Sequence, residues 1–177
     1  MEAPRLTPAG IIAKTVVTHT VTYFLLGVIS FLLLDYATVY ARTDVNQFVR
    51  QTDDPIVAAG PLFQPIRGLI FGIVLYLLRE PIFRRPRGWL VLWAALVVIG
   101  IIAPFGAAPG SIEGMVYTTL PLAFHVRSLP EVLLQSLLFS ALLVYWVHHP
   151  QQKWLTWVLT IAFILVLFFP ALGLLFT

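Results

Sequence analysis

Long apolar runs follow one another along most of this chain. They cover approximately residues 11–34, 57–78, 88–104, 131–147 and 154–176 of the 177-residue sequence. A helix needs about 20 apolar residues to cross a bilayer core, where every backbone N–H and C=O must find its partner within the protein. Only 11% of the residues are charged, against about 25% in soluble domains. The sequence therefore predicts an all-α polytopic membrane protein, with residues 1–177 forming a single integral membrane domain of five transmembrane helices.

Two longer connections separate the spans on one side. Residues 35–57 form a polar loop, in which Thr43 and Asp44 are typical of a helix N-cap and predict a short amphipathic helix on the membrane surface. Residues 104–130 are rich in proline and glycine, and their apolar middle is too short to cross a bilayer. We expect this long outer loop to be interfacial or re-entrant, and Pro130 to mark the start of the fourth span at Glu131.

Arginine and lysine are distributed unequally between the two sides that this threading defines. Cytoplasmic loops are enriched in both residue types. One side collects seven of them and the other three, while six of the eight acidic residues lie on the second side. This asymmetry predicts a cytoplasmic N-terminus and an outer C-terminus in the plasma membrane, as in a bacterial inner-membrane protein. The seven are Arg5, Lys14, Arg79, Arg84, Arg85, Arg87 and Lys153, and the three are Arg42, Arg50 and Arg127.

The second span carries an arginine near its middle. A charge at that depth costs about 3 kcal/mol on insertion scales, and intramembrane charges are typical of functional sites. Arg67 follows Pro61 and Pro65, which break or kink the outer half of the span. It also borders the Gly68 and Gly72 pair, whose spacing lets a neighbouring helix approach closely.

Acidic candidates for pairing with this arginine lie on the outer side, at Glu113 and Glu131. An arginine fork holds a carboxylate or a phosphate through two parallel hydrogen bonds. We predict an outward-facing polar pocket, and we weigh it equally against an internal ion pair that only fixes helix packing. The predicted ligand-binding residues are Arg67, Gln64, Glu113, His125, Arg127, Glu131 and Gln135.

A second polar centre lies in the first span. Thr15, His19 and Thr22 recur at helical spacing and form one stripe, and Tyr76 or Tyr23 is the expected partner of the histidine. Threonine hydroxyls commonly bond to their own helix backbone, so they say little by themselves. A structural role is therefore favoured over a binding role for this centre.

Two further histidine patterns bear on catalysis and on metals. His125 and Glu131 are candidates for an acid–base pair, but Pro130 separates them, and an interfacial histidine is the favoured interpretation. The adjacent His148 and His149 point in different directions on a helix, and the chain has no cysteine. We therefore expect no metal, no cofactor and no nucleic-acid partner.

The leading functional hypothesis is a small transporter-like membrane protein. It would bind a polar or anionic group, from a small molecule or a lipid head group, in an outward-facing intramembrane cavity. One alternative is a structural or accessory subunit of a larger membrane complex. Another is an enzyme that acts on a lipid head group, and enzymatic activity is the less favoured. The expected partners are the bilayer, an anionic or lipid ligand, and a partner membrane subunit or a second copy of the chain.

Overall fold

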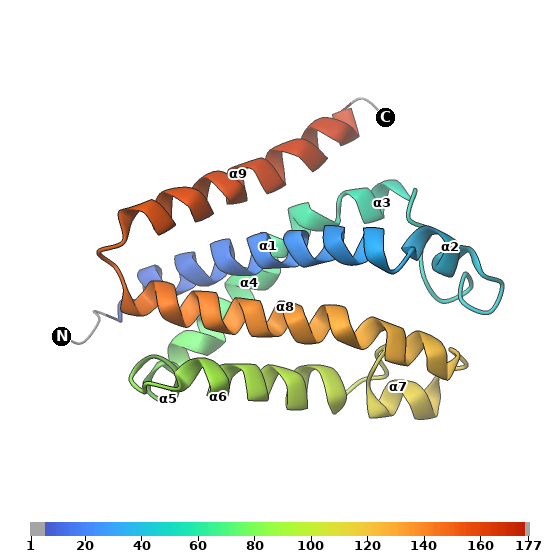
Figure 1. Cartoon of the computed structure of the whole chain (residues 1–177), viewed down its shortest axis with the longest axis horizontal. Coiled ribbons are helices and arrows are strands. Elements are labelled where there is room, and N and C mark those ends of the chain that lie inside the picture. The colour runs from blue at the N-terminus through green and yellow to red at the C-terminus, as the bar shows by residue number, and fades with distance from the viewer. Residues whose placement is uncertain (1–5, 176–177) are drawn as a thin grey trace.

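The computed structural model describes residues 6–175 as a bundle of helices, without a strand in that range (Figure 1). Among the described residues, four helices are long and apolar enough to cross a membrane: α1 (Pro8–Leu33), α4 (Gly60–Leu77), α8 (Leu122–His148) and α9 (Lys153–Leu175). The all-α class predicted from the sequence is confirmed, and these four helices are candidate membrane spans. The shorter segments are α2 (Tyr36–Ala41), α3 (Pro55–Ala58), α5 (Arg79–Phe83), α6 (Gly88–Ala95), the π-helical segment η1 (Leu96–Ile102) and α7 (Ile112–Tyr117).

Local capping chemistry sets where several helices begin. Thr7 precedes α1, and its hydroxyl oxygen accepts a hydrogen bond of 3.2 Å from the backbone N–H of Gly10. Asp54 caps α3 in the same way, through a 2.9 Å bond from the N–H of Ile56. Ser111 caps α7, where its hydroxyl oxygen accepts a 2.9 Å hydrogen bond from the N–H of Gly114. Each cap satisfies an N–H group that the first helical turn leaves without a partner.

Helix α1 is the centre of the bundle. Figure 1 shows α8 and α9 on either side of it and α4 behind, and α1 packs against all three. A Cβ added to Gly68 would lie 2.8 Å from the Cα of Val16, and one added to Gly72 would lie 2.9 Å from the Cα of Ile12. Glycine alone fits this close approach of α4 to α1. The small-residue face predicted in the second span is therefore confirmed.

The two ends of the bundle differ in composition. One holds the start of α1, α5 and residues 149–152, and we call it the α5 end; the other holds α2, α3 and α7, and we call it the α2 end (Figure 1). An apolar core lies toward the α5 end, with Leu75, Phe83, Leu92 and Leu143 among its members. Toward the α2 end, α1, α4 and α8 carry polar side chains instead.

Two sequence expectations are corrected by the structure. The fourth helix begins at Leu122 and not at Glu131, because α8 continues through Pro130. A proline removes one helical hydrogen bond, which a helix embedded among others tolerates. The short helix of the first loop is α2, directly after the first span, whereas Thr43 and Asp44 lie in a series of turns.

The segment expected as the third span is the shortest of the long apolar stretches. It forms α6 and η1, residues 88–102. At about 1.5 Å per residue these segments together reach about 22 Å, against about 30 Å for a bilayer core. The expected outer loop, residues 104–130, contains α7 and the beginning of α8. Residue 176, the expected end of the last span, lies outside the described residues.

Candidate functional site

His19 forms the floor of a polar region between α1, α4 and α8. The histidine is buried, and its Nε2 lies 3.2 Å from Oε1 of Gln64 on α4. An amide oxygen only accepts hydrogen bonds, so this contact places a proton on Nε2. The imidazole meets Phe71 of α4 and Phe139 of α8 edge to face, with ring centroids 4.9 and 5.7 Å away. These rings join the apolar core and separate it from the polar region.

Three further polar side chains lie near this floor, one from each helix; two of them are toward the α2 end, and the one on α4 is one turn from Gln64 toward the α5 end. They are Tyr23 on α1, Arg67 on α4 and Glu131 on α8. Neither charged group has an ion-pair partner within residues 6–175. We refer to His19, Tyr23, Gln64, Arg67 and Glu131 as the polar cluster.

Arg67 is exposed and keeps its donors unused. Its guanidinium lies over the ring of Phe71, 5.4 Å from the centroid, and makes no hydrogen bond in the described part of the chain. Arg67 does not meet Glu113, because Glu113 lies on α7, and α7 and α1 are on opposite sides of α8 (Figure 1). A guanidinium has five N–H donors in a planar fork. This fork is therefore available to an anionic group from outside the chain.

Glu131 is covered by the short helix α2. Its carboxylate accepts a hydrogen bond from the Tyr36 hydroxyl, and a Cβ on Gly27 would lie 3.9 Å from the carboxylate, so the group packs against α1. Tyr36 in turn stacks on Tyr40, with ring centroids 5.1 Å apart. Burial, followed by the hydrogen bond to Glu131, raises the pKa of Tyr36 above its usual range. Gln135 follows one turn later on α8 and is half-buried.

A tight reversal after α1 positions α2. Asp35 has a left-handed φ of 47°, a conformation that aspartate tolerates better than most residues. Its carbonyl oxygen accepts a 3.1 Å hydrogen bond from the N–H of Val39, which closes the first turn of α2. The reversal brings the tyrosines of α2 back over α8.

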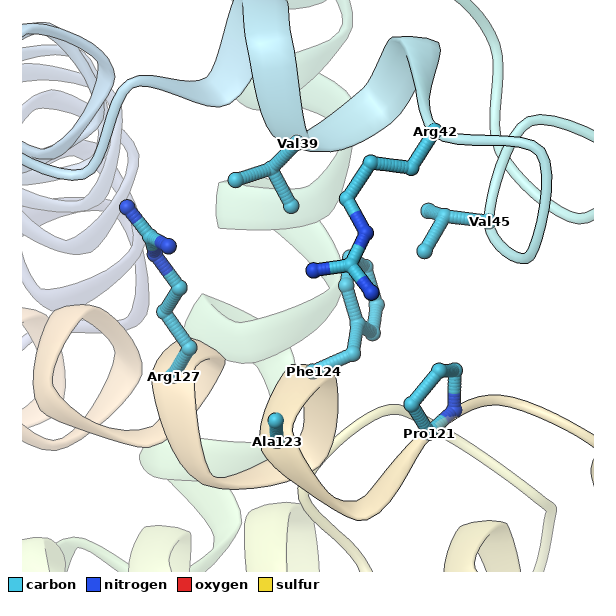
Figure 2. Close-up of a pocket in the computed structure, with 7 residues that line it drawn as sticks. All are labelled: Val39, Arg42, Val45, Pro121, Ala123, Phe124 and Arg127. Atoms are coloured by element: carbon cyan, nitrogen blue, oxygen red, sulfur yellow. The ribbon is translucent and has the colours of Figure 1, made fainter.

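Arg127 is directed to a helix end and not to the polar cluster. Its Nη2 donates to the carbonyl oxygen of Leu34, where α1 ends. Carbonyl groups at a helix C-terminus lack amide partners and favour a cation. Although Glu131 is one turn away on α8, the two side chains form no ion pair in the described structure. The Arg127 guanidinium also lines a small pocket at the α2 end (Figure 2).

His125 holds the preceding loop in place. It is buried, its Nδ1 accepts a 3.0 Å hydrogen bond from the N–H of Gly110, and its Nε2 lies 3.4 Å from the Thr118 hydroxyl. Six residues rotate a helix by about 240°, so His125 and Glu131 face different neighbours. The acid–base pair considered from the sequence is not formed in this structure.

The second polar centre is rearranged relative to the sequence expectation. Thr15 and Thr22 bond to their own helix, each with a 2.8 Å hydrogen bond to the carbonyl oxygen four residues earlier. Tyr76 lies toward the α5 end, where the Arg79 guanidinium covers its ring at 4.6 Å. The histidine ring lies 6.3 Å from the ring of Tyr23, the other expected partner, and its Nε2 contacts Gln64, which belongs to the other predicted set.

Tyr36, Tyr40 and Phe139 are absent from the sets predicted from the sequence. The two tyrosines did carry a signal, because they lie four residues apart directly after the first span and so share one helix face. Phe139 lies within an apolar run that contains other large side chains. Its contact with His19 becomes apparent only in the structure, where α8 packs on α1.

Comparison of the chain with protein-family models, with curated proteins and with solved structures found no match. Between residues 6 and 175, no three histidine or acidic side chains gather in an arrangement that could hold a metal ion. The function is therefore argued from the geometry and chemistry of the polar cluster.

Proposed function

We propose that this chain is a small transporter-like integral membrane protein that binds an anionic group in the polar cluster, entering from the α2 end. The observation that carries the proposal is the state of Arg67 and Glu131. These opposite charges lie on different helices, and neither is ion-paired within residues 6–175. Charged side chains that served only to fix helix packing inside a membrane would be expected to pair with one another.

The chemistry of the cluster favours a ligand with an anionic head and an apolar body. The Arg67 fork supplies parallel donors for a carboxylate or phosphate. The ring of Phe71, over which the guanidinium lies, supplies an apolar surface next to that fork. Both a small amphiphilic anion and a lipid head group have this combination.

The threading of the chain is part of the same proposal. Helix α4 ends at the α5 end and α8 begins at the α2 end, so α6, η1 and α7 must carry the chain from one end to the other (Figure 1). We count α6 with η1 as a fifth crossing, which a locally thinner bilayer accommodates. The charge asymmetry then places the N-terminus in the cytoplasm and the C-terminus outside, in a plasma (inner) membrane. A C-terminal alkaline phosphatase fusion is active under this topology and inactive under four crossings.

A binding experiment with a defined amphiphilic anion tests the function. Octanoate is titrated into the purified chain in neutral detergent, with octanol as the uncharged control, and the thermal unfolding midpoint is followed by circular dichroism. A ligand that binds the folded state raises this midpoint. We expect octanoate to raise it in the wild type and in Arg50→Gln, but not in Arg67→Gln. An equal response to octanol, or in Arg67→Gln, contradicts the proposal.

The rival hypotheses predict different results in the same experiment. If the chain is an accessory subunit with purely structural polar residues, Arg67→Gln lowers the unfolding midpoint without any ligand, and octanoate changes nothing. The enzyme hypothesis relied on His125 and Glu131 as acid and base, and their separate partners remove its geometric support.

A further inference from the structure

A second polar site lies at the α2 end, between α2 and the first turns of α8. Two arginines line it, Arg42 from the end of α2 and Arg127 from α8, and the Arg127 guanidinium is directed toward the end of α1 (Figure 2). Val39, Val45 and Phe124 supply apolar walls. The pocket has a volume of about 40 Å³. This is enough for a few water molecules, or for one phosphate group in their place.

The two arginines in this pocket keep donors free. Nε and Nη2 of Arg42 donate to the carboxylate of Asp44 at 3.0 and 2.7 Å, but Asp44 does not line the pocket. Arg127 uses Nη2 on the carbonyl oxygen of Leu34 and has no carboxylate partner within residues 6–175. Each guanidinium has five N–H donors, so both retain unused ones.

The Arg42–Asp44 pair is easily displaced. Its side chains are 53% and 41% exposed. Ion pairs with that exposure contribute little to stability, because water and salt screen them. Displacing the Asp44 carboxylate from the Arg42 fork would therefore cost an anion in the pocket little binding free energy.

We propose that this pocket binds a phosphate group, carried by an anionic phospholipid or by a soluble phosphate compound. Phosphate has enough acceptor oxygens to receive two guanidinium forks, whereas a carboxylate has two oxygens and suits one. Asp44 is the internal competitor, which holds Arg42 while the pocket is empty of phosphate.

This inference goes beyond the proposed function and does not rest on it. The pocket contains neither Arg67 nor Glu131, and the polar cluster contains neither Arg42 nor Arg127. The two sites can therefore be tested separately on the same preparation, through substitutions of Arg67 for one and of Arg42 for the other.

The test measures binding to the full chain in neutral detergent by isothermal titration calorimetry, at constant ionic strength set with chloride. The probes are inorganic phosphate and short-chain phosphatidylglycerol, and circular dichroism verifies the fold of every variant. We expect saturable binding by the wild type. Arg42→Gln should weaken it about tenfold or more, because charge-assisted hydrogen bonds are lost. Arg127→Lys retains a charge and one donor for the helix end but loses the fork, and should weaken it severalfold.

Asp44→Asn gives the opposite change. Removing the competing carboxylate frees the Arg42 fork, so binding should tighten severalfold. Arg50→Gln is the matched control, because Arg50 forms a similar exposed pair with Asp54, at 2.8 Å, and does not line the pocket. This control should bind phosphate as the wild type does.

The two probes also separate the possible sources of the phosphate. Binding of inorganic phosphate supports a soluble ligand, and binding of phosphatidylglycerol alone supports a lipid head group. The proposal is overturned if neither probe binds saturably to the wild type. It is equally overturned if Arg42→Gln and Arg50→Gln weaken binding to the same extent, or if Asp44→Asn leaves the affinity unchanged.

Discussion

Lys14 on α1 donates a 2.8 Å hydrogen bond from Nζ to the main-chain carbonyl oxygen of Trp146, near the end of α8. The ammonium also lies over the Trp146 ring, 5.3 Å from the centroid. This carbonyl has no amide donor one turn later, because residue 150 is proline. Arg127 makes the reciprocal contact with Leu34 at the end of α1. A cation therefore closes each end of the antiparallel α1–α8 pair.

Replacing Lys14 should destabilise the bundle. Lys14→Met keeps a long apolar side chain but leaves the Trp146 carbonyl without a donor, which should cost about 1–3 kcal/mol of unfolding free energy. Lys153→Met is the matched control, because Lys153 is exposed at the start of α9, and its effect should stay within about 0.5 kcal/mol. Unfolding in mixed micelles, followed by circular dichroism, gives both values. Equal stabilities of the two variants would refute the role assigned to Lys14.

Gly68 and Gly173 lie in different environments, so their replacement by alanine should change the stability of the fold differently. In Gly68→Ala the new methyl group would meet the backbone of Val16 at 2.8 Å, and such overpacking costs about 1–3 kcal/mol. In Gly173→Ala nothing lies within 4 Å, so the better helix propensity of alanine should stabilise α9 slightly. The unfolding midpoint should fall in the first variant and be unchanged or higher in the second. A neutral Gly68→Ala would show that α1 and α4 are not in backbone contact.

The folded protein should lose stability at alkaline pH because of Tyr36. Its pKa is raised in the folded state by burial and by the hydrogen bond to the Glu131 carboxylate, whereas an unfolded tyrosine has a pKa of about 10. The folded state thus holds this proton more tightly, and the stabilisation is complete below about pH 10 and is lost above it. Wild type should lose stability more steeply above pH 10 than Tyr36→Phe does.

Phenolate absorbance gives a direct check of the same residue. The folded wild type and folded Tyr36→Phe should show the same phenolate absorbance at about pH 10 to 11, because Tyr36 stays protonated. In the unfolded proteins the wild type should show one more phenolate. A difference of one phenolate between the folded proteins in this pH range would contradict the Tyr36–Glu131 hydrogen bond.

His19 and Gln64 should be energetically coupled. Either His19→Phe or Gln64→Leu alone leaves a buried polar partner unsatisfied, at about 1–3 kcal/mol. The double variant removes both partners and should cost less than the sum, with a coupling of about 1 kcal/mol. The four unfolding free energies of the cycle measure this difference. Strict additivity would mean that the 3.2 Å contact contributes nothing to folding.

Helix positions in this chain are largely predictable because they depend on local patterns. Apolar runs of spanning length locate α1 and α9, and the spacing of Gly68 and Gly72 indicates where α4 touches a neighbour. The start of α8 is missed because Pro130 matches the local rule for a helix start. That rule does not include the packing that allows a helix to continue through a proline.

The partners of the charged groups are much less predictable. Glu131 bonds to Tyr36, which lies 95 residues away in the sequence, and Gln64 bonds to His19 across two helices. The sequence indicates the depth of Arg67 in the membrane, but which side chains surround it depends on the rotation and crossing of three helices. Helical spacing alone indicated several residues of the polar cluster, but it did not predict which of them contact one another.

Access of water to Arg67 is the most direct test of the polar cluster as a binding site. The chain has no cysteine, so Arg67→Cys provides a single thiol for a charged, membrane-impermeant thiol reagent applied to either side of sealed vesicles. Ile66→Cys is the control at the same depth, because Ile66 is 60% exposed on a different face of α4. We predict rapid labelling of Arg67→Cys from the side of the α2 end and little labelling of Ile66→Cys. Equally slow labelling of both would show that no hydrated path reaches Arg67 and would contradict the proposed function.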